Sequence, residues 1–257
     1  MRKSTYYLAK RVLFLPYVWY MRWKRFGKSE VKYPPVRIFF EANYYQPEFT
    51  RFFKECVKDK DFLKRADLDE NSIIFDVGAY IGEWSKGVAE LYNNPHIYAF
   101  EPDEESYNTA LDALGGNDRF KLAKYGLSGK NEEVVFYSNK MGSSIYHSWS
   151  PNWSSQNRSK IQLRDVSEVI DELGVSNIDL MKINIEGGEY SLLNRLIESG
   201  AVKKCVSIMV QYHEWIPRAH RMRKKINKEL ALTHDVEWSY KFIWEKWKRK
   251  PGIANES

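Results

Sequence analysis

Two short segments of the chain hold residues that could bind a nucleoside. The first, DVGAYIG at residues 76–82, directly follows a short apolar run, and the second ends at Glu101, 19 residues after Gly82. Glycines let the backbone approach a ligand closely, and a carboxylate that ends the next strand can accept two hydrogen bonds from a ribose diol. The candidate cofactor-binding residues are Asp76, Gly78, Ala79, Tyr80, Gly82 and Glu101.

The spacing of the glycines separates two classes of nucleoside cofactor. Gly78 and Gly82 are spaced G-x-x-x-G, which differs from the G-x-G-x-x-G fingerprint of dinucleotide-binding loops. The carboxylate of Asp76 would attract a cation but repel a pyrophosphate. S-adenosylmethionine carries two cationic groups, an ammonium and a sulfonium. We therefore expect S-adenosylmethionine rather than NAD.

A second group of polar residues interrupts the apolar segment LMKINIEGGE at residues 180–189. Strand alternation would place Lys182, Asn184 and Glu186 on one face and the apolar residues between them on the other. Polar side chains on a buried strand cost free energy unless they pair or bind something. Two interpretations stay open: a structural ion pair between Lys182 and Glu186, or part of a functional site.

The elements that must position these residues alternate along the chain. Short apolar runs typical of buried parallel strands alternate with amphipathic segments typical of helices, which predicts a doubly wound, mostly parallel α/β sheet. A helix within residues 47–67 should precede the sheet, and residues 240–247 alternate like a final antiparallel strand. The expected strands are 72–77, 96–100, 121–125, 133–137, 177–185 and 202–212, and the main expected helices are 81–91, 104–114, 189–199 and 219–230.

Three blocks of sequence together resemble one known family. DVGAYIGEW, AFEPDEES and NIDLMKINIEGGEYSLL follow one another in the order found in the FkbM-type methyltransferases, which have the class I Rossmann-like fold. The resemblance implies O-methylation, often of a sugar hydroxyl, with Asp76, Gly78 and Glu101 holding S-adenosylmethionine. The chain departs from the family pattern at Asn184 and Gln211, where relatives usually carry Asp and often Glu.

Methyl transfer to a hydroxyl requires loss of the hydroxyl proton, so a general base is expected. His213 is the first candidate, because it follows the fifth strand at the ligand edge and titrates near neutral pH. Glu186, oriented by Lys182, is the second, and His147 is the third. With Asn184 beside them, the candidate catalytic residues are His213, Glu186, Lys182 and Asn184; a histidine without a catalytic role remains the alternative for His213.

A long polar stretch at residues 138–162 is rich in Ser and Asn and is expected to be a loop. His147, Trp149 and Trp153 lie in it, and the two indole rings could stack on sugar rings or simply pack within the loop. No metal is expected, because Asn184, Glu186 and His213 would offer a hard cation only one acid.

The positive charge of the chain is concentrated at its start. The chain has 257 residues and a net charge of +6, yet residues 1–40 hold ten Lys/Arg and a single acid, Glu30. This segment also holds many aromatic residues, so it is expected either to lie on the inner face of a membrane or to pack as a helix on the domain or on a second subunit. Two cysteines without a metal-binding spacing favour a reducing cytoplasm.

These observations predict three regions and one leading function. Residues 1–66 form a basic, aromatic helical extension, residues 67–247 the methyltransferase domain, and residues 248–257 a tail. The leading function is an S-adenosylmethionine-dependent O-methyltransferase acting on a sugar or glycan, including a lipid-linked glycan. The alternatives are a nucleic-acid methyltransferase, which the absent [DN]-P-P-[YF] motif and the non-basic main domain disfavour, and a membrane-associated binding protein without catalysis. A homo-oligomer stays open.

Overall fold

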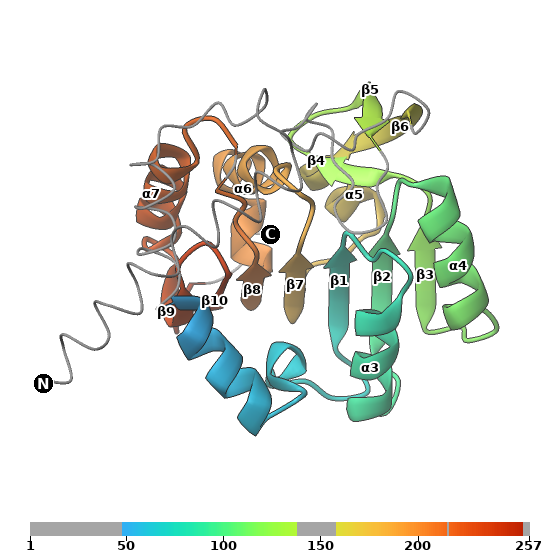
Figure 1. Ribbon diagram of the computed structural model, residues 1–257, viewed down its shortest axis with the longest axis horizontal. Helices are drawn as coiled ribbons and strands as arrows, with labels where there is room; N and C mark the ends of the chain where they lie inside the picture. Colours follow the sequence, from blue (N-terminus) through green and yellow to red (C-terminus); the bar gives the residue numbers. More distant parts are fainter. Residues whose placement is uncertain (1–47, 138–157, 215, 254–257) are drawn as a thin grey trace, which may run out of the picture.

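A seven-stranded sheet forms the centre of the protein (Figure 1), whose computed structural model describes residues 48–137, 158–214 and 216–253. The first five strands in spatial order run parallel, whereas β10 pairs antiparallel with both β8 and β9. The strands, in spatial order, are β3 (Phe120–Ala123), β2 (His96–Phe100), β1 (Ile73–Val77), β7 (Leu180–Ile183), β8 (Ser207–Val210), β10 (Trp244–Arg249) and β9 (His234–Tyr240). The predicted mostly parallel α/β sheet is confirmed.

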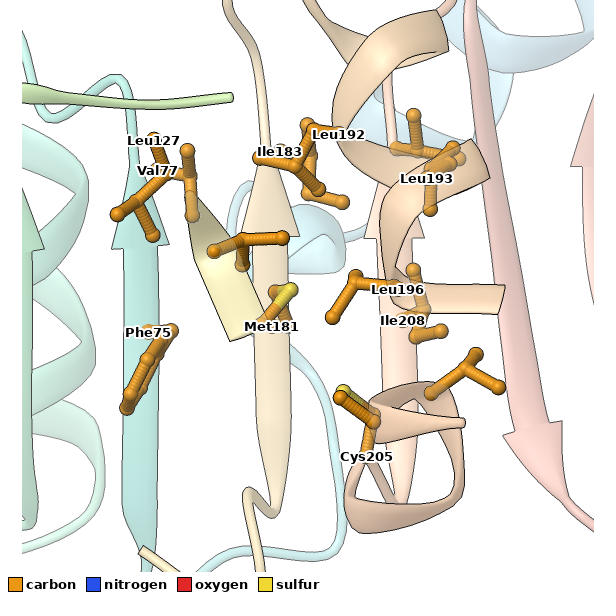
Figure 2. Packing of buried hydrophobic residues seen from close by; sticks show 14 of the residues in the cluster. Phe75, Val77, Leu127, Met181, Ile183, Leu192, Leu193, Leu196, Cys205 and Ile208 are labelled. Atoms are coloured by element: carbon orange, nitrogen blue, oxygen red, sulfur yellow. The ribbon is translucent and has the colours of Figure 1, made fainter. Parts of the chain in front are cut away.

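Side chains alternate between the two faces of this sheet, and each face is covered. Phe75, Met181 and Ile208 lie in one buried cluster with leucines of α6, as Figure 2 shows, while Ile74 and Leu180 belong to a second cluster on the other face. The first cluster is covered by α5 (Val166–Glu172), α6 (Glu189–Glu198) and α7 (Ala219–Leu230), and the second by α3 (Glu83–Leu91), beside which α4 (Glu104–Leu114) packs.

The final part of the sheet is a hairpin rather than the single strand predicted over residues 240–247. The strand prediction was wrong because the chain reverses between Tyr240 and Trp244: Phe242 has a φ of 58°, and the Ile243 N–H donates to the Tyr240 carbonyl at 2.8 Å. Aromatic side chains are half-buried or buried on both strands, so the apolar alternation continues through the turn. β10 ends at Arg249, two residues beyond the predicted end of the domain.

A second, three-stranded sheet was not predicted as such. It consists of β4 (Gly126–Ser128), β6 (Arg158–Asp165) and β5 (Glu132–Tyr137), with β6 in the middle. Because β6 begins at Arg158, residues 158–162 are strand rather than the loop expected there. Figure 1 shows this sheet near the arrowheads of β1 and β2. His147, Trp149 and Trp153 lie outside the described residues.

Before the sheet, residues 48–58 form a helix, followed by the short 3-10 turn η1 (Phe62–Lys64). The helix packs on the β9 end of the sheet through Phe52, whose ring centroid lies 5.5 Å from that of Tyr240. No helix within the described ranges is both long and apolar enough to cross a bilayer. Residues 1–40, the segment with the predicted membrane role, lie outside the described residues.

Candidate active site

The predicted cofactor and catalytic residues come together at one edge of the large sheet. β1, β2, β7 and β8 are parallel, so their carboxyl ends meet at the same edge. Asp76 lies at the end of β1, Glu101 follows β2, Asn184 and Glu186 follow β7, and His213 follows β8. In sheets of this kind, ligands bind outside the carboxyl ends of the strands. The structure therefore brings these residues together at one edge, and their roles stay predictions.

Asp76 and Lys182 form a buried ion pair between β1 and β7. The Lys182 ammonium lies 2.8 Å from Asp76 Oδ1 and 2.8 Å from the Gly78 carbonyl oxygen, and the Ser85 hydroxyl donates to Asp76 Oδ2 at 2.6 Å. Asp76 is fully buried. Two expectations are thereby corrected: the cation that faces Asp76 comes from this chain, and Lys182 pairs with Asp76 rather than with Glu186.

Gly78 and Gly82 pack closely against neighbouring residues of the chain. Both have a φ of +81°, and a Cβ on Gly78 would lie 2.1 Å from the Asn184 carbonyl oxygen. A Cβ on Gly82 would lie 2.9 Å from a Leu114 methyl group of α4. Substituting Gly78 would therefore disturb the contact between the loop and β7, and not only the ligand. The N–H groups of Gly78 and Ala79 both donate to the Phe100 carbonyl at the end of β2.

The Glu101 carboxylate is fixed by two backbone N–H groups. Tyr80 N–H donates to Oε2 at 2.8 Å and Asp103 N–H donates to Oε1 at 2.9 Å. A carboxylate has about four lone-pair sites, so acceptor capacity remains for a diol. Burial raises the pKa of Glu101 to about 7, although the two backbone hydrogen bonds act in the opposite direction. Tyr80, with a φ of 53° and a half-exposed ring, borders this carboxylate.

His213 lies between two carboxylates, Glu186 and Glu189. Its Nε2 is 3.3 Å from Glu186 Oε1, and its Nδ1 is 3.2 Å from Glu189 Oε1. Glu189 is fully buried and also accepts hydrogen bonds from the N–H groups of Gly187 and His213, both at 2.7 Å. We call these three residues the Glu186–His213–Glu189 group. Glu189 was not predicted from the sequence, where its signal is an acid three residues after Glu186.

The two carboxylates determine the protonation state of His213. Burial alone would lower its pKa, but the hydrogen bonds and charges of Glu186 and Glu189 outweigh burial and raise the pKa of His213 to about 10. The imidazole is therefore protonated at neutral pH and has no lone pair for a substrate proton. This disfavours His213 as the base. Glu186 is the more exposed carboxylate of the group, and its φ of 46° is unusual for a residue with a side chain.

The region that holds all of these residues matches one family of enzymes. The sequence model of the Methyltransferase FkbM domain matches residues 76–235, well over half of the chain. The chain belongs to the FkbM methyltransferase family. The matched region starts at the buried Asp76 and includes Glu101, the Glu186–His213–Glu189 group and the helix that follows β8.

Individual relatives of this FkbM methyltransferase are distant. Methyltransferase sdnD from Sordaria araneosa is 29% identical over 167 residues, which cover 52% of this chain and 63% of the relative. The chain thus spans less than two thirds of that protein's length. Among solved structures, methyltransferase FkbM from Methylobacillus flagellatus aligns with a TM-score of 0.47 and 15% identity over 72% of this chain and 45% of that one. The fibrillarin pre-rRNA processing protein of Methanococcus jannaschii aligns with a TM-score of 0.44, 11% identity, and coverages of 72% and 69%.

S-adenosylmethionine is the usual methyl donor of this family, and the site has a feature that fits it. Asn184 Oδ1 is buried and has no hydrogen-bond partner within the described part of the chain. A buried acceptor of this kind calls for a donor, and an ammonium group supplies one. The backbone carbonyl of Asn184 packs against Gly78, so the acceptor lies beside the loop that ends β1.

The pKa of Glu101 leads to a prediction for cofactor binding. In the predicted contact, ribose hydroxyls would donate to the ionised carboxylate of Glu101, so binding would require a proton to leave Glu101 when the pH is below about 7. We expect S-adenosylmethionine affinity at pH 6 to be about tenfold weaker than at pH 8, as measured by calorimetry. Glu101→Gln should bind more weakly and lose this dependence. An unchanged pH profile in the variant would contradict the assignment.

Proposed function

We propose that this chain is an S-adenosylmethionine-dependent O-methyltransferase that acts on a hydroxyl of a sugar or glycan. The observation that carries the proposal is the Glu186–His213–Glu189 group. Its carboxylates could accept a proton, and it lies on the same sheet edge as Glu101 and Asn184. Membership of the FkbM family supports methyl transfer. The sugar or glycan acceptor rests on what the three sequence blocks resemble.

The proposed cofactor contacts follow from the donors and acceptors at the edge. Glu101 accepts from the ribose diol, and Asn184 Oδ1 accepts from the ammonium group. Lys182, which is paired with Asp76, donates to the Gly78 carbonyl and so holds the loop between β1 and α3. When bound, S-adenosylmethionine supplies a methyl group on a positively charged sulfur.

The reaction requires one bond to form, one to break and one proton to move. Bound S-adenosylmethionine would supply its methyl carbon to the acceptor oxygen, and the electron pair of the broken carbon–sulfur bond would stay on sulfur as a neutral thioether. The hydroxyl proton passes to Glu186. With His213 protonated, the Glu186–His213–Glu189 group carries a net charge of −1, so it can take up this proton and become neutral.

His213 and Glu189 hold Glu186 in position. Glu189 accepts two backbone hydrogen bonds, from the turn after β7 and from the segment after β8, so it joins the two loops. The imidazolium then contacts Glu186 through Nε2. Orientation of a reacting group can lower a barrier by roughly 7–11 kcal/mol, and a general base contributes roughly 10²- to 10⁴-fold in rate. His147, Trp149 and Trp153 remain proposed acceptor residues.

The experiment that tests the function follows transfer of a labelled methyl group. The purified full chain is incubated with methyl-labelled S-adenosylmethionine and, in parallel, with oligosaccharides, lipid-linked glycans and RNA. We expect label on a hydroxyl oxygen of a glycan, located by mass spectrometry, and bound S-adenosylmethionine or S-adenosylhomocysteine in the purified protein. Label on RNA would support the nucleic-acid alternative, and failure to bind either nucleoside would support a binding protein without catalysis.

A further inference from the structure

The helix at residues 48–58 exposes a stripe of apolar side chains. Phe49, Phe53 and Val57 are 56%, 57% and 69% exposed, and they follow one another at intervals of four residues. This spacing places them on one face of a helix, and the rings of Phe49 and Phe53 are stacked with centroids 6.3 Å apart. We call these three residues the apolar stripe. An exposed apolar face of this kind marks a contact surface.

The opposite side of the same helix is already packed on the protein. Phe52 contacts Tyr240 and also Phe62, whose centroid lies 6.2 Å away. The Arg51 guanidinium lies over the Tyr240 ring at 5.2 Å from its centroid. These contacts fix the helix on β9 and η1, so the apolar stripe is not the face that attaches the helix to the domain. Figure 1 shows the helix in blue at the margin of the molecule.

The cations and the acids around the apolar stripe differ in their exposure to solvent. Between residues 48 and 60, the cations Arg51, Lys54, Lys58 and Lys60 are all exposed, whereas the acids Glu48, Glu55 and Asp59 are all half-buried. Glu48 and Glu55 are paired with Arg51 and Lys58, each at 2.9 Å. The solvent-facing surface of this segment therefore combines the apolar stripe with four exposed cations, two of them paired with acids, and residues 48–60 have a net charge of +1. That combination is complementary to an anionic lipid surface.

The amino end of this helix lies near the edge of the sheet that holds the candidate active site. Arg51 lies over Tyr240, and Tyr240 pairs with Trp244. The neighbour of Trp244, Glu245, pairs with Val210, the last residue of β8. The helix therefore begins on the carboxyl edge of the sheet. In the sequence, residues 41–47 separate it from the segment with ten Lys/Arg and one acid at residues 1–40.

We propose that the apolar stripe is a membrane-docking surface, which inserts Phe49, Phe53 and Val57 into the interface of an anionic bilayer. Aromatic side chains favour the membrane interface, and Lys and Arg favour anionic headgroups. The exposed cations Lys54, Lys58 and Lys60 lie at headgroup level. Docking through this helix brings the β9 end of the sheet close to the membrane. The proposal does not depend on which acceptor is methylated.

The test is vesicle binding by the full chain. Co-sedimentation is measured with vesicles of phosphatidylcholine alone and with added phosphatidylserine, at low and high salt. We expect binding that requires phosphatidylserine, weakens as salt rises, and falls at least tenfold in Phe49→Glu/Phe53→Glu. The matched control is Leu111→Glu/Val135→Glu, which changes two exposed apolar residues on α4 and β5 and should bind like the unmodified chain.

Each result of this test supports or overturns the proposal. Thermal unfolding by circular dichroism shows whether the two double variants remain folded, and Lys54→Glu provides a milder variant that should bind anionic vesicles severalfold more weakly. Unchanged binding in Phe49→Glu/Phe53→Glu would overturn the proposal and assign lipid binding to other residues. A dimer in sedimentation velocity that this variant abolishes, without vesicle binding by the unmodified chain, would instead assign the apolar stripe to a second copy of the chain.

Discussion

Replacing Glu186 by Gln is expected to lower the rate of methyl transfer by at least about a hundredfold, because a general base contributes roughly 10²- to 10⁴-fold. The amide has the size of the carboxylate but cannot take up the hydroxyl proton. Glu186 does not belong to the proposed cofactor contacts, so S-adenosylmethionine affinity should stay within about twofold of the original value. Single-turnover kinetics with an unmethylated acceptor and calorimetry with the cofactor measure the two effects separately.

The matched control for this variant is Glu198→Gln, an exposed acid on α6, which should keep full activity. Glu189→Gln provides a different comparison, because Glu189 acts only through His213 and the backbone. Removing its charge should lower the pKa of His213 and shift the pH–rate profile toward lower pH, with a smaller loss of rate than Glu186→Gln. Turnover close to normal in Glu186→Gln would remove Glu186 from the mechanism.

Strand patterns in the sequence were sufficient to predict which residues meet at the edge of the candidate site. Apolar runs ending at Asp76 and Glu101 correspond to β1 and β2, and the alternation at Leu180, Met181 and Ile183 matches the two faces of β7. Periodicity is a property of one strand, so it can be recognised in one segment. The order of elements along the chain then placed the ends of the parallel strands on one side.

Partners across strands could not be found in the same way. Alternation put Lys182 on a face with Glu186, four residues away in sequence, but β7 ends at Ile183 and the alternation does not extend to Glu186. The true partner depends on the register of β7 against β1, in which Lys182 lies directly opposite Asp76. The same limit applies to Glu189, whose contact with His213 joins segments that follow two different strands. A single sequence does not contain the register that decides these pairs.

Lys182→Met is expected to lower the free energy of unfolding by about 3–5 kcal/mol, the largest change in stability that we predict for the site. The substitution keeps an unbranched side chain of similar length but leaves the carboxylate of Asp76 buried and without its cation, while the Ser85 hydroxyl still donates to it. It also removes the donor to the Gly78 carbonyl, so the cofactor loop should loosen. Urea unfolding followed by circular dichroism gives the change in stability.

The double variant Asp76→Asn/Lys182→Met separates the cost of an uncompensated charge from the cost of lost packing. Asn at residue 76 can still accept from Ser85 but carries no charge, so the double variant should be more stable than Lys182→Met alone, although it has one more substitution. S-adenosylmethionine affinity should remain reduced in both variants, because neither restores the contact with the Gly78 carbonyl. If the double variant is less stable than Lys182→Met, the uncompensated charge is not the main cause of the lost stability. The ion pair would then mainly fill space between β1 and β7.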